Sequence, residues 1–219
     1  MAKNFIFDLD GTLLDTLTDL RDAINGAFEA AGIPFRYSKE ECRFFIGHGA
    51  DVFLHKALRD LDDDYHFQKA KKEYMMRYRA YQGRHTKPFP DMLETLQKLK
   101  NSDNSLFVCT NKPDSFAIEI VYKMFGHDLF RAVRGIREGE EPKPNPAIVD
   151  YFVSSFGLER KDCLFVGDSD VDRDTAKNAS LPFYLCLWGY GDYNEGLTKS
   201  AEMCLNEPKD LLKVSHGTF

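Results

Sequence analysis

The chain has 219 residues, of which 43% are hydrophobic and 29% are charged. These proportions are typical of a folded globular protein and exclude a disordered or collagen-like chain. The formal net charge is −6, which argues against the basic surface that a sequence-independent nucleic-acid binder needs. The longest apolar run near the C-terminal end, residues 181–188, is far shorter than the roughly 20 residues of a membrane-spanning helix. We therefore expect neither a nucleic-acid nor a membrane partner.

The cysteines and the N-terminal residues indicate a cellular location. The five cysteines are scattered and include no Cys-x-x-Cys pair, as expected for reduced thiols. Asp8 interrupts the N-terminal apolar run too early for the core of a signal peptide. The six histidines lack the spacing of zinc ligands. We therefore predict a cytoplasmic protein without zinc, and we expect it to be a monomer or a homodimer.

The first part of the chain is predicted to be mostly helical. A short β-compatible run, 4–8, is followed by apolar residues whose spacing predicts a helix from Leu17 to Ala31. Ser38 with Glu41 three positions later is the pattern of a capping box. Further helices are expected from residue 51 onward and over 65–81. Because 16–83 contain no good strand, we predict that they form a separate helical cap domain.

After Pro88 the pattern changes to strands that alternate with helices. The strands are expected at 106–109, 132–133, 163–166 and 183–187, and the helices at 92–99, 114–125 and 147–156, with one more helix that follows Asp170 and ends at Ala179. Such alternation is typical of a parallel sheet with helices on both faces. We therefore predict an α/β, Rossmann-like core formed by 1–15 and 84–219, with the cap inserted in it.

Polar residues lie at the carboxyl ends of the three strongest predicted strands, where open α/β sheets bind ligands. These residues are Asp8 and Asp10, then Thr110, Asn111 and Lys112, then Asp168 and Asp172. Lys143 lies in a proline-rich loop before a further helix. Since these strand ends meet at one sheet edge, four aspartates, a threonine and a lysine are expected to converge on one pocket.

A cluster of carboxylates restricts the chemistry of that pocket. Two carboxylates about 4 Å apart repel by roughly 4 kcal/mol at an effective dielectric constant of about 20, so the cluster needs protons or a cation. Oxygen ligands without histidine or cysteine favour Mg²⁺ over zinc. One carboxylate can act as a nucleophile and a second as an acid and base, while lysine and threonine bind phosphate oxygens. Taken singly, each of these residues could equally be a turn, a helix cap or a solvated side chain.

Taken together, the residues resemble a known superfamily. The segment 8–16 (DLDGTLLDT) resembles the first motif of the haloacid dehalogenase superfamily. The likeness continues through Thr110, Lys143-Pro144 and 167–172 (GDSDVD), in that superfamily's order and spacing. Within the superfamily, the chain most resembles the phosphoglycolate phosphatases. Segments 46–52, 110–113 and 189–191 resemble the corresponding segments of those enzymes.

The resemblance implies a role for each acidic residue. Asp8 is expected to be the nucleophile and Asp10 the general acid and base. Mg²⁺ would be bound by the side chains of Asp8 and Asp168 and by the backbone carbonyl of Asp10. Asp172 would support the site from outside, through metal-bound water or through Lys143.

The resemblance also implies the groups that hold the substrate. Thr110 and Lys143 would hold the transferring phosphoryl group. Further substrate contacts are expected from Gly11, Asn111, Gly47, His48 and Gly49.

We therefore predict a Mg²⁺-dependent phosphatase that hydrolyses a small, phosphoglycolate-like phosphorylated metabolite through an aspartyl-phosphate. A pyrophosphatase or a sugar phosphomutase of the same superfamily stays open as an alternative. So does a non-catalytic phosphate-ligand sensor on the same fold. A hydrolytic dehalogenase is disfavoured, because Asp10 and a metal site would have no role in it.

Overall fold

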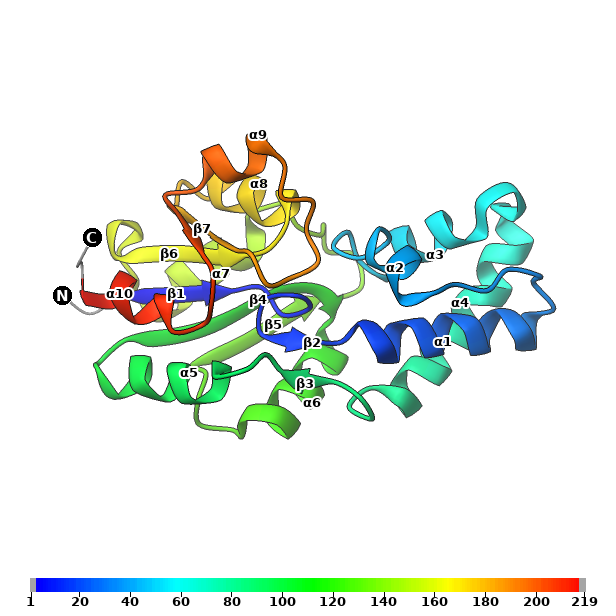
Figure 1. Cartoon of the computed structure of the whole chain (residues 1–219), viewed down its shortest axis with the longest axis horizontal. Coiled ribbons are helices and arrows are strands. Elements are labelled where there is room, and N and C mark those ends of the chain that lie inside the picture. Colours follow the sequence, from blue (N-terminus) through cyan, green and yellow to red (C-terminus); the bar gives the residue numbers. More distant parts are fainter. Residues whose placement is uncertain (1–2, 217–219) are drawn as a thin grey trace.

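A six-stranded parallel sheet forms the core of the computed structural model, which describes residues 3–216 (Figure 1). The strand order is β5-β4-β1-β6-β7-β8. The strands are β1 (Asn4–Phe7), β4 (Ser105–Pro113), β5 (Ala132–Ile136), β6 (Cys163–Gly167), β7 (Phe183–Cys186) and β8 (Met203–Leu205). Because β1 lies between β4 and β6, the three predicted polar clusters are neighbours at one edge of the sheet. The predicted fold class is confirmed.

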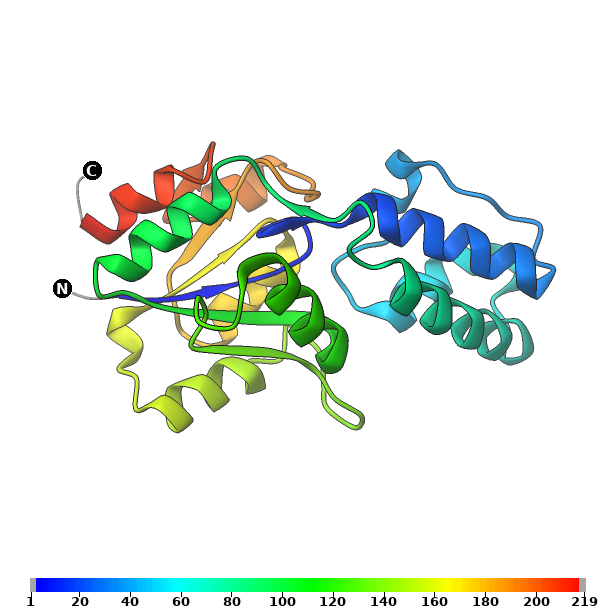
Figure 2. The same cartoon turned by 90° about the horizontal axis from the view of Figure 1, so that it is seen from below.

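Side chains alternate between the two faces of the sheet, as the period of a strand requires. On β1, Phe5 and Phe7 pack into one apolar cluster and Ile6 into the other. The first face is covered by α5 (Met92–Asn101), α6 (Asp114–Phe125) and α10 (Asp210–His216), and the second by α7 (Ala147–Phe156), α8 (Asp170–Asn178) and α9 (Glu195–Ser200). In Figure 2, the green α5 and the red α10 lie on one side of the strands and the yellow-green α7 on the other.

Between β1 and β4 the chain forms a helical unit beside the sheet (Figures 1 and 2). Its helices are α1 (Leu17–Ala31), α2 (Lys39–Arg43), α3 (Ala50–Leu58) and α4 (Asp64–Tyr81), with a short 3₁₀ turn at Arg59–Leu61. We call these helices and their connections the cap. The cap helices enclose a hydrophobic cluster of their own, which includes Phe28, Leu54 and Tyr74. The predicted helices 17–31 and 65–81 are confirmed, whereas the domain limits at 15/16 and 83/84 stay a prediction.

The predicted capping box is present at the start of α2. The Ser38 hydroxyl accepts a hydrogen bond from the Glu41 N–H, and the Glu41 carboxylate accepts one from the Ser38 N–H. These two bonds satisfy N–H groups that the helix itself leaves unpaired. The box fixes the place at which the chain turns into this short helix.

Two chain segments join the cap to the core, and they pair with each other. The antiparallel strands β2 (Leu14–Asp15) and β3 (Lys87–Pro88) form a small ribbon between the two parts. The buried Asp19 carboxylate, in the first turn of α1, accepts hydrogen bonds from the N–H groups of four consecutive residues, 83–86. The two connections are therefore fastened together at the start of the cap.

The structure corrects the predicted limits of one strand. β4 continues to Pro113 instead of ending at Cys109, and its pairing with β5 is irregular between these two residues. Thr110, Asn111 and Lys112 therefore lie within an extended strand and not in the loop after it. They are polar but buried, because the cap lies against this end of the sheet. A prediction from apolar residues alone therefore ends such a strand too early.

Several short elements were not predicted. These are β8, α9, α10 and the β2–β3 ribbon. Each is only two to seven residues long, too short for the apolar period to be distinctive. No helix among residues 3–216 combines the length and the apolar character of a membrane span.

Candidate active site

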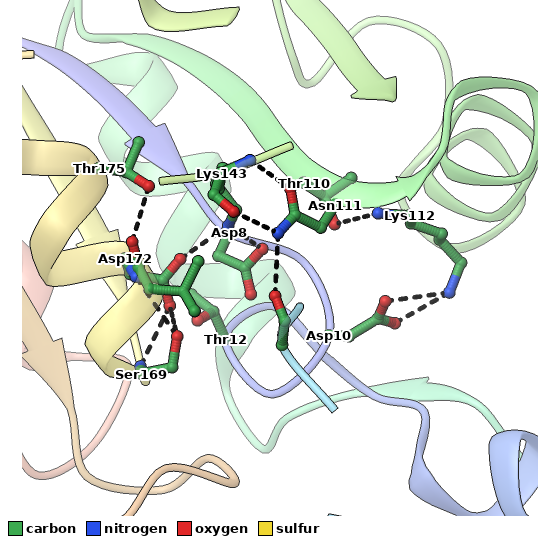
Figure 3. Close-up of polar contacts among 12 residues, drawn as sticks. Asp8, Asp10, Thr12, Thr110, Asn111, Lys112, Lys143, Ser169, Asp172 and Thr175 are labelled. Atoms are coloured by element: carbon green, nitrogen blue, oxygen red, sulfur yellow. Dashed lines mark hydrogen bonds and ion pairs between the residues drawn. The ribbon is translucent and has the colours of Figure 1, made fainter. Parts of the chain in front are cut away.

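The predicted site residues gather at the carboxyl ends of β1, β4 and β6 (Figure 3). Asp8 follows β1 directly, Asp168 follows β6, and Asp172 lies in the first turn of α8. Lys143 reaches the same place from the loop before α7. A cavity of about 380 Å³ opens on these four residues, and cap residues form its other wall. The sheet topology thus joins residues that are up to 164 positions apart in the sequence (172 − 8).

Three buried carboxylates form a possible metal site. Oxygen atoms of Asp8, Asp168 and Asp172 all lie within 4.8 Å of one another. Burial and the neighbouring carboxylates together raise the pKa of Asp8 to about 8, although Lys143 acts against this shift. Burial and the charge of Asp172 likewise raise the pKa of Asp168 to about 7. Burial therefore favours the protonated forms of these two acids, even with Lys143 beside them.

Lys143 supplies the positive charge within the cluster. Its Nζ donates hydrogen bonds of 2.7 Å to Asp8 Oδ1 and to Asp172 Oδ1. Burial acts to lower the pKa of this lysine, but the carboxylates of Asp172 and Asp8 outweigh it and raise the pKa, so the ammonium stays charged. Asp172 Oδ2 accepts the N–H groups of Asp168 and Ser169. The expected contact between Asp172 and Lys143 is therefore present, while the role of Asp172 in catalysis stays a prediction.

Both oxygen atoms of Asp168 have fixed partners. Oδ1 accepts the Thr12 hydroxyl at 2.9 Å, and Oδ2 accepts the Tyr190 N–H at 2.7 Å. Gly11 lies against the same carboxylate with φ +97°, and a Cβ added there would lie 2.5 Å from Asp168 Oδ2. A side chain at Gly11 would thus collide with the site, which is a packing reason for glycine. The predicted substrate contact of Gly11 stays a prediction.

Asp10 lies in the same cavity as Asp8 but has a different partner. Its two carboxylate oxygens accept hydrogen bonds from Lys112 Nζ at 3.0 and 3.1 Å. The Tyr78 hydroxyl of α4 also contacts this lysine. Figure 3 shows Asp10 turned toward Lys112, apart from the cluster around Asp8. The Asp10 side chain is therefore not one of the three clustered carboxylates, and the metal contact expected of its backbone carbonyl stays a prediction.

The Asn111 side chain joins the Lys143 loop to the cap. Its Oδ1 accepts the Lys143 N–H at 2.7 Å, and its Nδ2 donates to the carbonyls of Lys143 at 3.1 Å and Gly47 at 3.0 Å. Its amide is thus bonded to protein atoms in this structure, and the predicted contact with substrate stays a prediction. Thr110 is buried beside it and, together with Asp8, lines a second cavity of about 60 Å³.

The predicted cap turn lies over the site. Gly47 and His48 line the 380 Å³ cavity opposite the carboxylates. Gly49 lines a smaller cavity of about 60 Å³, whose aromatic wall includes Phe53 and Tyr78 and which also reaches Asp8. The two glycines have φ of +107° and +90°, a region that favours glycine. His48 Nδ1 is buried and has no hydrogen-bond partner among the described residues.

Sequence reasoning assigned no role to three residues that touch this site. Lys112 belongs to one of the predicted polar clusters and Thr12 lies within the motif 8–16, but the spacing in the sequence does not reveal their partners Asp10 and Asp168. Tyr190 contacts Asp168 from a loop 22 residues further along the chain. Its only signal in the sequence is the pair of glycines that flank it.

Comparisons with known proteins agree with this geometry. The family model described as haloacid dehalogenase-like hydrolase matches residues 5–186. A phosphoglycolate phosphatase of Aliivibrio fischeri is 32% identical over 97% of this chain and 96% of its own length, and that of Aquifex aeolicus is 30% identical over 95% and 94%. A crystal structure described as a predicted phosphoglycolate phosphatase from Haemophilus somnus has a TM-score of 0.88 and 31% identity, with 97% of each chain covered.

These matches cover the sheet and the cap together. They indicate a phosphoric monoester hydrolase. The chain belongs to the haloacid dehalogenase-like hydrolase family.

Proposed function

We propose that this hydrolase removes the phosphoryl group from a small phosphorylated metabolite of the phosphoglycolate type, with Mg²⁺ as its cofactor and Asp8 as the nucleophile. The observation that carries the proposal is the buried group of Asp8, Lys143 and Asp168 beneath a cap. It is supported by the likeness to phosphoglycolate phosphatases over nearly the whole chain.

The donor set fits a hard divalent cation. The three clustered groups are all carboxylates, and oxygen ligands are what Mg²⁺ prefers. Asp8 and Asp168 would hold the ion with the backbone carbonyl of Asp10. When bound, Mg²⁺ supplies positive charge that offsets the carboxylates and the phosphate oxygens.

The protein's own residues divide the work of the reaction. A carboxylate oxygen of Asp8 attacks phosphorus, and the bond from phosphorus to the ester oxygen breaks as Asp10 donates a proton to that oxygen. Lys143 and Thr110 hold the phosphoryl oxygens during the transfer. Asp10, now a base, takes a proton from the water that attacks phosphorus of the acyl phosphate, which releases phosphate and restores Asp8.

A comparison of substrates tests this proposal. Phosphate release is measured for 2-phosphoglycolate, a hexose 1-phosphate, pyrophosphate and an aryl phosphate, with Mg²⁺ and with EDTA. We expect the highest kcat/KM for 2-phosphoglycolate and no turnover in EDTA. Asp8→Asn, which keeps the shape but removes the nucleophile, should lose nearly all activity. The control is Asp174→Asn, which should keep its activity, because Asp174 is a partly exposed carboxylate paired with Arg173.

Other results would contradict the proposal. Isomerisation of the hexose phosphate without phosphate release indicates a mutase, and a preference for pyrophosphate indicates a pyrophosphatase. Binding without turnover of any substrate indicates a sensor. Full activity of folded Asp8→Asn would exclude the covalent route.

A further inference from the structure

The loop after β7 touches both the acidic cluster and the cap. In this loop, Tyr190 donates its backbone N–H to Asp168 Oδ2 at 2.7 Å. Its hydroxyl accepts the N–H groups of Thr16 at 2.7 Å and Leu17 at 3.1 Å, and donates to Asp15 Oδ1 at 2.8 Å. One residue therefore contacts the candidate metal site with its backbone and the first connection of the cap with its side chain.

The glycines on either side explain how the loop comes so close to Asp168. A Cβ at Gly189 would lie 2.5 Å from Asp168 Oδ2 and 2.4 Å from the Gly11 carbonyl oxygen. A Cβ at Gly191 would lie 1.8 Å from the Asp168 carbonyl oxygen. Neither position can hold a side chain without a shift of the backbone. The two glycines thus allow the loop to lie directly against Asp168, and the Tyr190 side chain extends away from it.

The Tyr190 hydroxyl replaces a missing helix cap. The first N–H groups of a helix have no partner within it, and a short polar side chain at the preceding residue often accepts one of them. Thr16 occupies that position before α1, but its side chain makes no such bond. The hydroxyl of Tyr190, from the core, accepts these N–H groups instead. The start of α1, the first helix of the cap, is therefore held by a residue more than 170 positions away in the sequence.

A second contact ties the same loop to the cap wall of the cavity. Arg43, at the end of α2, donates from Nε to the Tyr190 carbonyl at 2.7 Å and from Nη2 to the Gly191 carbonyl at 2.8 Å. Rotation of the cap about the β2–β3 ribbon would pull on this loop at both points. Since the loop also holds Asp168, such a pull acts directly on a carboxylate of the cluster.

We propose that Tyr190 is a positioning residue that couples the Asp168 carboxylate to the hinge of the cap, by which we mean residues 14–18. Asp168 is then correctly placed only when the cap is closed over the site. This inference rests on the proposed function in one respect, namely that Asp168 is a metal ligand. Binding at the cluster then stabilises the hinge and, by linkage, a fixed hinge strengthens binding at the cluster.

Amide hydrogen exchange of the hinge tests the coupling without reference to turnover. Exchange over residues 14–18 is measured in the protein alone, with Mg²⁺, and with Mg²⁺ plus orthovanadate, for wild type and Tyr190→Phe. The variant keeps the ring and the N–H to Asp168 but removes the hydroxyl. Tyr184→Phe is the control, since its ring is buried on β7 and its hydroxyl has no hydrogen bond to the described residues.

We expect the additions to slow exchange at the hinge of wild type and Tyr184→Phe, but not of Tyr190→Phe. In Tyr190→Phe the Mg²⁺ concentration for half-maximal activity should rise, while the KM for an aryl phosphate changes little. The rise should stay below the roughly 10- to 100-fold found when a direct hydrogen-bond partner of a metal ligand is lost, because this variant keeps the N–H bond to Asp168. Arg43→Met should give the same changes, but smaller ones. It takes the place of Tyr190→Phe in the experiment if that variant does not fold.

Hinge exchange in wild type that does not respond to the additions would overturn the coupling, even in an active phosphatase. So would an equal response in wild type and Tyr190→Phe. An inactive wild type whose hinge responds to Mg²⁺ would instead contradict the proposed function and leave the coupling in place.

Discussion

Each of the two aspartates of the first motif pairs with a buried lysine of its own. Lys143 binds Asp8, and Lys112 binds Asp10; each lysine side chain is only 2% exposed. Lysine is rarely so buried unless it is paired. The motif spacing predicts that Asp8 and Asp10 share a cavity, and they do. It cannot predict that each receives its own cation, because both lysines come from segments more than 100 residues away.

At this scale we predict that Asp10→Asn lowers kcat by about 10²–10⁴-fold, the usual contribution of a general acid and base. Asp170→Asn serves as the control, since Asp170 is an exposed carboxylate on the rim of the same cavity. Its kcat should stay within about threefold of wild type, as it removes no group from the reaction. Steady-state kinetics with 2-phosphoglycolate measures both. A loss of less than about threefold in Asp10→Asn would show that Asp10 only orients Lys112.

His48 is the residue for which we predict an effect on specificity. The core residues handle the phosphoryl group, which all candidate substrates share, so discrimination falls to groups that touch the remainder of the molecule. His48 lies in the cap wall of the cavity and its Nδ1 is buried without a partner among residues 3–216. A ligand atom at that nitrogen would complete its hydrogen bonding.

We expect His48→Ala to lower kcat/KM for 2-phosphoglycolate by roughly 10- to 150-fold, which corresponds to the loss of a hydrogen bond to a charged group. The loss for an aryl phosphate should be much smaller. His127→Ala is the control for the general effect of the substitution, because His127 is exposed and lies outside the cap. Equal losses on both substrates would assign His48 a structural role in the turn.

Among the elements, the connection between the cap and the core was the hardest part to predict. Helices α1 and α4 are long and periodic, so their positions follow from the apolar pattern. The ribbon of β2 and β3 has two residues in each strand, and the buried Asp19 holds the second connection against the start of α1. Such an arrangement depends on one long-range carboxylate and leaves no periodic signal.

We predict that Asp19→Ala lowers the free energy of unfolding by about 3 kcal/mol, because several buried N–H groups lose their acceptor at once. Asp22→Ala, one turn further along α1, is the matched control. Within residues 3–216, Asp22 pairs only with its neighbour Arg21 at the surface, and the loss should be no more than about 1 kcal/mol. Urea unfolding curves compare the two. Similar losses in both variants would mean that Asp19 does not hold the second connection.

At the scale of the whole molecule, the acidic cluster makes stability depend on pH. Folding places Asp8 and Asp168 where burial and neighbouring carboxylates raise their pKa values to about 8 and about 7, from 3.8 in the unfolded chain. The folded protein therefore binds more protons than the unfolded chain between about pH 4 and about pH 8. The stability that these protonated groups contribute is complete below about pH 4 and is lost as the pH rises through their folded pKa values.

A divalent cation changes this balance, because it binds the carboxylates in place of protons. We predict that Mg²⁺ raises the melting temperature more at about pH 8 than at about pH 5.5, where protons compete with the ion for Asp8 and Asp168. Thermal unfolding with excess Mg²⁺ and with EDTA, at both pH values, measures the difference. In Asp168→Asn one ligand is lost, so the gap between Mg²⁺ and EDTA should shrink at about pH 8. A gap that is equal at the two pH values, or larger at the lower one, would show that the ion does not bind at these carboxylates.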